Sequence, residues 1–189
     1  SKLIKDIYLA TDNKKTKKIG LNANIKVPFL RPKYLSDSFV HIKSIISFFL
    51  DRLEKKKSID IIVVATENFP LRNPNIFDKM INKLLKNNFD TVIACKEEKG
   101  SIFIKKDNKL NKIHNGEVPS NYMAQNAFSS RIGIAYVARA SSLRRESNLL
   151  SGKLGYYFIK NTLEMTEVNN KNFSKYTKEL IKQSYINNN

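Results

Sequence analysis

Cysteine, histidine, glycine and tryptophan are scarce in this 189-residue chain, which has one cysteine, two histidines, six glycines and no tryptophan. A single cysteine cannot form an internal disulfide, and Cys95 stands in an apolar run, as a buried thiol does. His41 and His114 are far apart and lack the spacing of a metal-binding pair, so we expect no zinc site. The dispersed glycines form no Gly-rich phosphate loop. The sequence therefore argues against disulfide, zinc and P-loop chemistry.

Long apolar runs are also missing. No run approaches the roughly 18 residues that a membrane span requires, and the first residues lack the apolar segment of a signal peptide. The sequence thus predicts a soluble, cytoplasmic protein with no membrane partner. Hydrophobic residues still make up 41% of the chain, which is enough for a packed core. Because neither a repeat nor a linker divides the chain, we expect a single domain over residues 1–189.

Acidic residues are few relative to basic ones, with 17 Asp and Glu against 34 Lys and Arg, for a net charge of +17. Clustered basic residues bind nucleic acid by releasing counterions, and steeply salt-dependent DNA binding is one hypothesis. The lysines are instead spread along the chain beside many Asn and Ile, a mixture that low-GC codon usage also produces. The short basic runs fall where helices would face solvent. We therefore expect no specific nucleic-acid partner.

Short apolar runs alternate with segments of helical periodicity. This alternation is typical of an α/β protein, and it predicts a three-layer, mostly parallel sheet flanked by helices. Residues 101–125 break the pattern, because a short alternating run and a turn are followed by polar, irregular sequence, so we expect a small antiparallel excursion there. The expected strands are residues 7–11, 25–27, 59–66, 91–95, 132–139 and 156–159, and the expected helices are residues 16–20, 38–56, 140–149, 172–184 and one starting at Asn73-Pro74.

Charged residues follow three of the expected strands. Asp12 follows the first, Arg31 stands between Pro28 and Pro32 after the second, and Arg72 lies in the loop after the third. Parallel α/β sheets bind ligands outside the carboxyl ends of their strands, so these positions suit an anionic ligand. Surface ion pairs are the alternative for both arginines. Alone, these features predict only that some anion is bound.

Several segments together resemble one family, the cytidylyltransferases that make CMP-activated nonulosonic acids such as CMP-sialic acid. Residues 1–12, ending in Ala-Thr-Asp, are similar to that family's second strand, and residues 30–37 are similar to its Leu-Arg-Pro-x-x-Leu-Ala-x-Asp signature. Residues 70–72 match the end of its Gln-Pro-Thr-Ser-Pro-Leu-Arg loop, and residues 131–137 resemble a later strand on the substrate side. The segments occur in the family's order along most of the chain.

The resemblance implies a nucleotide-diphospho-sugar transferase-like fold and a reaction in which a sugar-acid hydroxyl attacks the α-phosphate of CTP and releases pyrophosphate. Mg²⁺ assists this reaction in the family by offsetting phosphate charge. It further implies a homodimer, to which residues 101–125 would contribute, and CTP and an acidic nine-carbon sugar as partners. No catalytic residue is assigned by position. The implied nucleotide-binding residues are Arg31 and Asp12, and the implied substrate-binding residues are Thr66, Arg72, Gln125 and Arg131.

The sequence also departs from the family. The family's first strand and Gly-rich triphosphate loop have no counterpart, and residues 166–169 replace its metal-binding Asp-Ile-Asp-Thr, so we expect no metal ligands. We therefore expect impaired catalysis; the alternative is a non-catalytic binding or dimerisation module. Because the first strand would lie between the strands at Ile7 and Ile61, we expect these two to close onto each other, pair with another chain or leave a gap.

Overall fold

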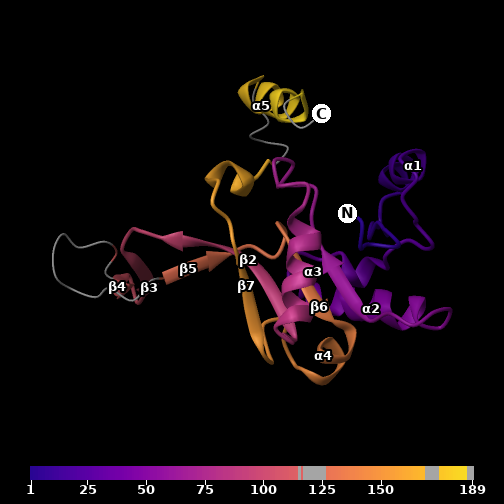
Figure 1. Ribbon diagram of the computed structural model, residues 1–189, viewed down its shortest axis with the longest axis horizontal. Coiled ribbons are helices and arrows are strands. Elements are labelled where there is room, and N and C mark those ends of the chain that lie inside the picture. Colours follow the sequence, from indigo (N-terminus) through magenta and orange to yellow (C-terminus); the bar gives the residue numbers. More distant parts are fainter. Residues whose placement is uncertain (115, 117–126, 169–174, 187–189) are drawn as a thin grey trace.

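The computed structural model describes residues 1–114, 116, 127–168 and 175–186 (Figure 1). Among the described residues, helices and strands alternate from residue 42 to residue 98 and again from residue 136 onward, and strands alone occur between these parts, which makes this a mixed α/β protein. The helices are α1 (Lys14–Asn22), α2 (Ile42–Leu53), α3 (Ile76–Lys86), α4 (Ala140–Arg145) and α5 (Lys175–Ile186), with short 3-10 helices η1 (Lys33–Leu35) and η2 (Thr162–Met165). The strands are β1 (Ile61–Val64), β2 (Thr91–Glu98), β3 (Ile102–Lys106), β4 (Lys109–His114), β5 (Ala127–Ser130), β6 (Tyr136–Arg139) and β7 (Leu154–Phe158).

The main sheet is mixed. Strand β6 lies between β1 and β2 and is antiparallel to both, β5 is antiparallel to the second half of β2, and β7 is parallel to β2. A mostly parallel sheet is therefore not confirmed, because among the described residues only the β2–β7 pair is parallel. Nevertheless β1, β2 and β7 run in one direction, since β1 and β2 are each antiparallel to β6. Their carboxyl ends consequently lie along the same edge of the sheet.

Helices cover both faces of this sheet around β1, β6 and β2. Helix α3 packs on one face through side chains that include the fully buried Met80 and Leu84, which contact the cluster of Val92 and Val137. Helices α2 and α4 cover the other face, where Leu50 and Leu143 pack with Tyr136. Burial of each such side chain contributes about 1.5–3 kcal/mol. Alternate residues of each strand thus reach the two core clusters, as a three-layer α/β arrangement requires.

The two expected amino-terminal strands do not join the main sheet. Tyr8 and Lys26 form an isolated parallel bridge, in which the Leu9 N–H donates to the Lys26 carbonyl at 3.0 Å and the Lys26 N–H donates to the Ile7 carbonyl at 3.1 Å. Within the described residues, no backbone hydrogen bond joins residues 7–11 to β1. Of the three outcomes expected for these segments, closure onto each other does not occur.

The antiparallel excursion is present. Strands β3 and β4 form a separate two-stranded hairpin, and Asp107 and Asn108 at its turn have φ angles of 50° and 58°, which a two-residue type I′ turn requires. In Figure 1 the hairpin stands away from the helices, at the opposite end of the molecule from α1. The remainder of the expected excursion, residues 117–126, lies outside the described residues. None of the helices in the described part of the chain is long and apolar enough to span a membrane.

Candidate functional site

The loop that follows β1 at the carboxyl edge is held by Arg72. Its Nε donates to the Phe69 carbonyl at 2.8 Å, and one terminal nitrogen donates to the Thr66 carbonyl. The guanidinium also lies 5.8 Å from the centre of the Phe77 ring. Phe69 is buried beneath the loop. Arg72 therefore fixes the shape of residues 66–72, and its predicted contact with a substrate stays a prediction.

A turn between β5 and β6 packs against the same loop. The Thr66 N–H donates to the Gly133 carbonyl at 2.8 Å, and a Cβ atom on Gly133 would lie only 2.6 Å from the Thr66 hydroxyl oxygen and 2.9 Å from the Phe69 ring. Glycine is needed here because the two backbones approach so closely. The same turn carries Arg131, whose side chain is 59% exposed.

The segment after η2 closes this group of loops. The Val168 N–H donates to the Asn68 carbonyl at 2.7 Å, and the Asn73 N–H donates to a carboxylate oxygen of Glu164 at 3.0 Å. Glu167 lies 2.6 Å from a terminal nitrogen of Arg131. The predicted residues Thr66, Arg72 and Arg131 are thus brought together, with Glu167 as the counter-ion of the exposed arginine.

Arg31 and Asp12 form a second group. The Arg31 N–H donates to the Thr11 carbonyl at 2.8 Å, its Nε donates to the Ser36 hydroxyl at 3.1 Å, and a terminal nitrogen lies 3.8 Å from Asp12. Hydrogen bonding by Ser36, followed by the Asp12 backbone and Arg31, lowers the pKa of Asp12. The prolines on either side hold the backbone extended, with Pro32 at φ −61° and ψ 148°. The arginine is thereby presented on a stiff segment with its guanidinium mostly covered.

The six predicted site residues therefore fall into separate groups. Arg31 and Asp12 contact each other, and Thr66, Arg72 and Arg131 share the carboxyl edge. The hydrogen bonds and ion pairs given above join residues within each group. Gln125 lies outside the described residues. The assignment of nucleotide and substrate roles to these groups stays a prediction.

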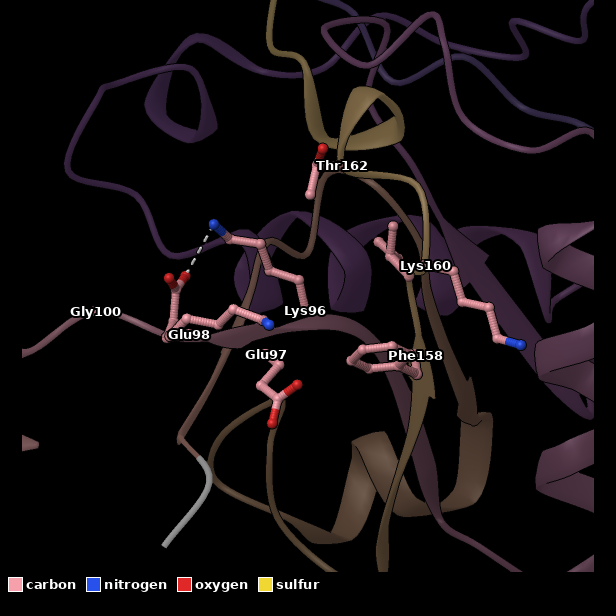
Figure 2. Close-up of a pocket in the computed structure, with 9 residues that line it drawn as sticks. Lys96, Glu97, Glu98, Gly100, Phe158, Lys160 and Thr162 are labelled. Atoms are coloured by element: carbon pink, nitrogen blue, oxygen red, sulfur yellow. Dashed lines mark ion pairs between the residues drawn. The ribbon is translucent and has the colours of Figure 1, made fainter. Parts of the chain in front are cut away.

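A pocket lies farther along the same edge, between the carboxyl ends of β2 and β7 (Figure 2). It has a volume of about 370 Å³, and Phe158 and Thr162 come from the β7 side. Figure 2 shows Lys96 reaching toward Glu98, at 3.2 Å, and Lys160 pointing outward. The Ser129 hydroxyl, followed by Lys96, lowers the pKa of Glu98. Three lysines thus line the pocket, Lys96, Lys99 and Lys160, and Lys96 is paired with Glu98.

Sequence reasoning missed this pocket and the role of residues 164–168. A signal for the pocket was present, because the charged run from Lys96 to Lys99 directly follows the apolar residues 91–95. Charged residues at that point mark the end of a buried strand, where ligands bind. The pairing of Arg131 with Glu167 had no such signal, because the two residues are 36 positions apart and belong to different elements.

The family resemblance implies Mg²⁺, which needs oxygen ligands. Mg²⁺ is held by one or two carboxylates together with substrate phosphates. Among the residues described, no three acidic, histidine or cysteine side chains lie close enough together to hold a metal. Two carboxylates in the candidate groups, Asp12 and Glu167, each have an arginine partner. We therefore derive no step that passes through a metal ion.

The mixed α/β sheet, with loops and cations gathered at the carboxyl ends of its co-directional strands, defines an α/β protein suited to an anionic ligand. The family model described as cytidylyltransferase matches residues 1–186, nearly the whole chain, and the chain belongs to that family. No curated protein matches the chain. Family membership supports nucleotidyl transfer as the general type of reaction, with CTP as the nucleotide.

Proposed function

We propose that this chain is a cytidylyltransferase whose acceptor is a nonulosonic, sialic-type sugar acid, and that the reaction takes place in the cytoplasm. The observation that carries the proposal is Arg31, a stiffly mounted cation beside Asp12 at the end of residues 7–11, within a chain that belongs to the family. A guanidinium held in place before the ligand arrives binds phosphate without a large ordering cost. Its partners Ser36 and Thr11 supply that order.

In the proposed reaction, a hydroxyl oxygen of the sugar acid attacks the α-phosphorus of CTP. The new bond joins that oxygen to the α-phosphorus, the bond from the α-phosphorus to the β-bridging oxygen breaks, and pyrophosphate leaves. Catalysis of this kind depends on positioning and on stabilising the phosphate charge. Arg31 would contact the nucleotide, while Arg131 would receive the carboxylate of the acid. The base that accepts the hydroxyl proton is unassigned.

An acid that binds Arg131 must compete with Glu167, which already contacts its guanidinium at 2.6 Å. Exchange of one carboxylate for another at an exposed arginine costs little, because both make the same charge-assisted hydrogen bonds. The pairing therefore favours acidic acceptors over neutral sugars. It also keeps the positive charge of Arg131 balanced when no acceptor is bound.

We further propose that residues 1–189 by themselves catalyse this transfer slowly. Residues 166–168 are Thr, Glu and Val, so Glu167 is the one carboxylate among them, and it is paired with Arg131. Few groups are thus left to offset the charge that develops on the triphosphate.

The test is pyrophosphate release from CTP, Mg²⁺ and a panel of nonulosonic acids, with neutral hexoses as the control acceptors. We expect slow release, well below a typical enzyme turnover of about 10 s⁻¹, that depends on an acidic acceptor. Release at an ordinary enzymatic rate would refute the proposal that catalysis is slow, but it would still support the proposed transfer reaction. Equal release with neutral and acidic acceptors would refute the proposed acceptor class.

The β3–β4 hairpin favours a second candidate function, a non-catalytic binding or dimerisation module. Its strands expose large apolar side chains, with Phe103 49% exposed, Leu110 68% and Ile113 59%. Exposed apolar side chains grouped on one small hairpin are typical of an interaction surface. A second copy of the chain is the partner that the family resemblance implies.

Association through the hairpin predicts a homodimer in light scattering at tens of micromolar protein. Replacing Leu110 with lysine should shift the equilibrium toward the monomer by about tenfold or more, because burial of an unpaired charge opposes association. Replacing the exposed Leu163, on η2 and away from the hairpin, serves as the matched control. A monomer at every concentration tested would contradict the dimer.

A further inference from the structure

The pocket between β2 and β7 forms where the two strands separate (Figure 2). Their parallel pairing ends at Cys95 and Phe158, and the Ile159 N–H donates to the Cys95 carbonyl at 2.8 Å. Strand β2 then continues to Glu98 with β5 along one side, while the chain after β7 turns into η2 at Thr162. The β7 side of residues 96–98 therefore borders the pocket.

Glu97 places its backbone N–H and carbonyl on the pocket side. Hydrogen bonds along β2 alternate between its two sides: the Ala94 N–H donates to the Ala135 carbonyl at 3.2 Å, whereas the Cys95 carbonyl accepts from the β7 side. Both backbone groups of one strand residue lie on the same side, so those of Glu97, two residues after Cys95, face the pocket. Among the described residues, neither group has a backbone partner. One donor beside one acceptor is the complement of a secondary amide.

Phe158 supplies an apolar wall of the pocket. Its side chain is 38% exposed, and its ring stands 6.4 Å from the Phe128 ring at an interplanar angle of 87°. Such an edge-to-face contact is favourable and holds the ring in place. The pocket volume of about 370 Å³ lies within the usual range for small-molecule sites. The pocket thus has room for a compact ligand with an apolar part.

Positive charge is in excess around the pocket, which is lined by three lysines and two glutamates. Lys96 is paired with Glu98, and hydrogen bonding by Ser129, followed by Lys96, lowers the pKa of Glu98. Glu98 therefore stays ionised at neutral pH and balances Lys96. Figure 2 shows the Glu97 side chain pointing away from Lys96. An anionic group close to Lys160, on the β7 side, would balance the remaining positive charge.

We propose that this pocket binds a small acid that carries an acylamido group, namely an N-acylated α-amino acid with an apolar side chain. The amide would exchange two hydrogen bonds with the Glu97 backbone, as an added strand does with the edge of a sheet. The apolar side chain would pack on Phe158, and the carboxylate would contact Lys160. This site consists of residues outside the Arg31 and Arg131 groups, so it does not depend on the proposed transfer reaction.

The test is an NMR titration of the whole, isotope-labelled chain with N-acetyl-leucine as the probe. We expect the Glu97 amide resonance to shift and to saturate with a dissociation constant of about 1 mM, as is usual for a ligand of this size. Two matched ligands each lack one group: N-acetyl-leucine amide lacks the carboxylate, and isocaproate lacks the acylamido group. Each should bind at least about tenfold more weakly, because one recognised group is missing.

A peptide distinguishes two sources of the same chemistry, a free acid and the carboxyl end of a polypeptide. Binding of acetyl-Gly-Gly-Leu at least about threefold tighter than N-acetyl-leucine would identify the polypeptide end, because its further amides would also contact the protein. Equal or weaker binding of the peptide would identify the free acid. Both results support an acylamido acid as the ligand.

Two substitutions separate the backbone of Glu97 from its side chain. Glu97→Pro removes the N–H on the side of β2 that faces away from β5, and it should abolish the ligand-induced shifts at neighbouring amides. Glu97→Gln removes the same charge but keeps the N–H, and its affinity should stay within about twofold of the unaltered chain.

A second pair tests the contact with the carboxylate. Lys160→Gln should weaken binding by about threefold to tenfold. Lys86→Gln is the matched control, because Lys86 ends α3 just before β2 begins and so lies at the opposite edge of the sheet. It should leave the affinity unchanged, since charge at that distance is screened.

The ligand series with the unaltered chain decides the matter even if Glu97→Pro fails to fold. No shift of the Glu97 amide up to about 20 mM N-acetyl-leucine would overturn the proposal. Equal binding of N-acetyl-leucine and its two matched ligands, undiminished binding to a folded Glu97→Pro chain, or equal losses in Lys160→Gln and Lys86→Gln would overturn it as well.

Discussion

Replacing Arg31 with glutamine is expected to weaken the binding of CTP by about tenfold to a hundredfold, the usual loss for one charge-assisted hydrogen-bonded contact. Ser36 and the Thr11 carbonyl hold Arg31 in place, so the unaltered chain spends little free energy on ordering it. Glutamine keeps a polar, hydrogen-bonding side chain but loses the positive charge. Isothermal titration calorimetry at fixed salt measures the dissociation constants of the two proteins.

The matched control is Arg145→Gln, which removes the same charge from α4, where the guanidinium lies beside Glu146 at 3.0 Å. Its effect on CTP binding should stay within about twofold, because general attraction by net charge is screened over a Debye length of about 8 Å. Equal weakening by both substitutions would mean that the overall charge of +17, rather than a site, attracts the nucleotide. An unchanged affinity in Arg31→Gln would remove Arg31 from the nucleotide site.

Replacing Gly133 with alanine is expected to lower the free energy of unfolding by about 1–3 kcal/mol, the range for overpacking. The new methyl group would lie 2.6 Å from the Thr66 hydroxyl and 2.9 Å from the Phe69 ring, distances that force a backbone shift. The backbone shift would displace residues 66–72, whose shape Arg72 fixes, and therefore any ligand binding at Arg131 should weaken as well. Urea unfolding monitored by circular dichroism measures the change in stability.

Gly100→Ala is the matched control, because a Cβ on Gly100 would meet nothing within 4 Å. Its unfolding free energy should change by no more than about 0.5 kcal/mol. In a Gly133→Ala background, Thr66→Ala removes the nearest colliding oxygen and should recover part of the lost stability. If both substitutions changed the free energy of unfolding equally, the close approach of Gly133 to Thr66 and Phe69 would not be what limits stability.

The helices with strong apolar stripes could be predicted from sequence. Residues 38–56 and the segment after Asn73-Pro74 contain α2 and α3, and the apolar residues Ile46, Leu50 and Met80 in these segments are buried. Periodicity identifies such helices because burial of one face decides their position. It places their ends less well, since the structure starts α2 at Ile42 rather than at Ser38.

Strand direction could not be predicted in the same way. Residues 132–139 are expected as a strand of a mostly parallel sheet, yet β6 is antiparallel to both of its neighbours. A buried apolar run has the same composition in either direction, because both of its faces are covered. Strand β5 was missed for a related reason: its four residues, Ala-Phe-Ser-Ser, carry little apolar pattern, and pairing with Glu97 and Cys95 on β2 defines it.

The candidate site was predictable where a local signal existed. Arg31 and Asp12 each follow an expected strand, and the structure places them 3.8 Å apart. Contacts between distant segments left no such trace: Glu164 reaches Asn73 over 91 positions, and Glu167 reaches Arg131. Neither glutamate belongs to a motif that spacing alone would identify. Tertiary packing therefore decides which charges in this part of the chain remain available to a ligand.

The bonds between residues 66–73 and 164–168 have a consequence for motion. The Asn68 carbonyl receives the Val168 N–H at 2.7 Å, and Glu164 receives the Asn73 N–H at 3.0 Å. Segments joined at two points move together on the timescale of loop opening. Any displacement that frees Arg131 from Glu167 therefore pulls on the loop after β1. If a ligand binds at Arg131, we therefore expect its release to require both segments to move together.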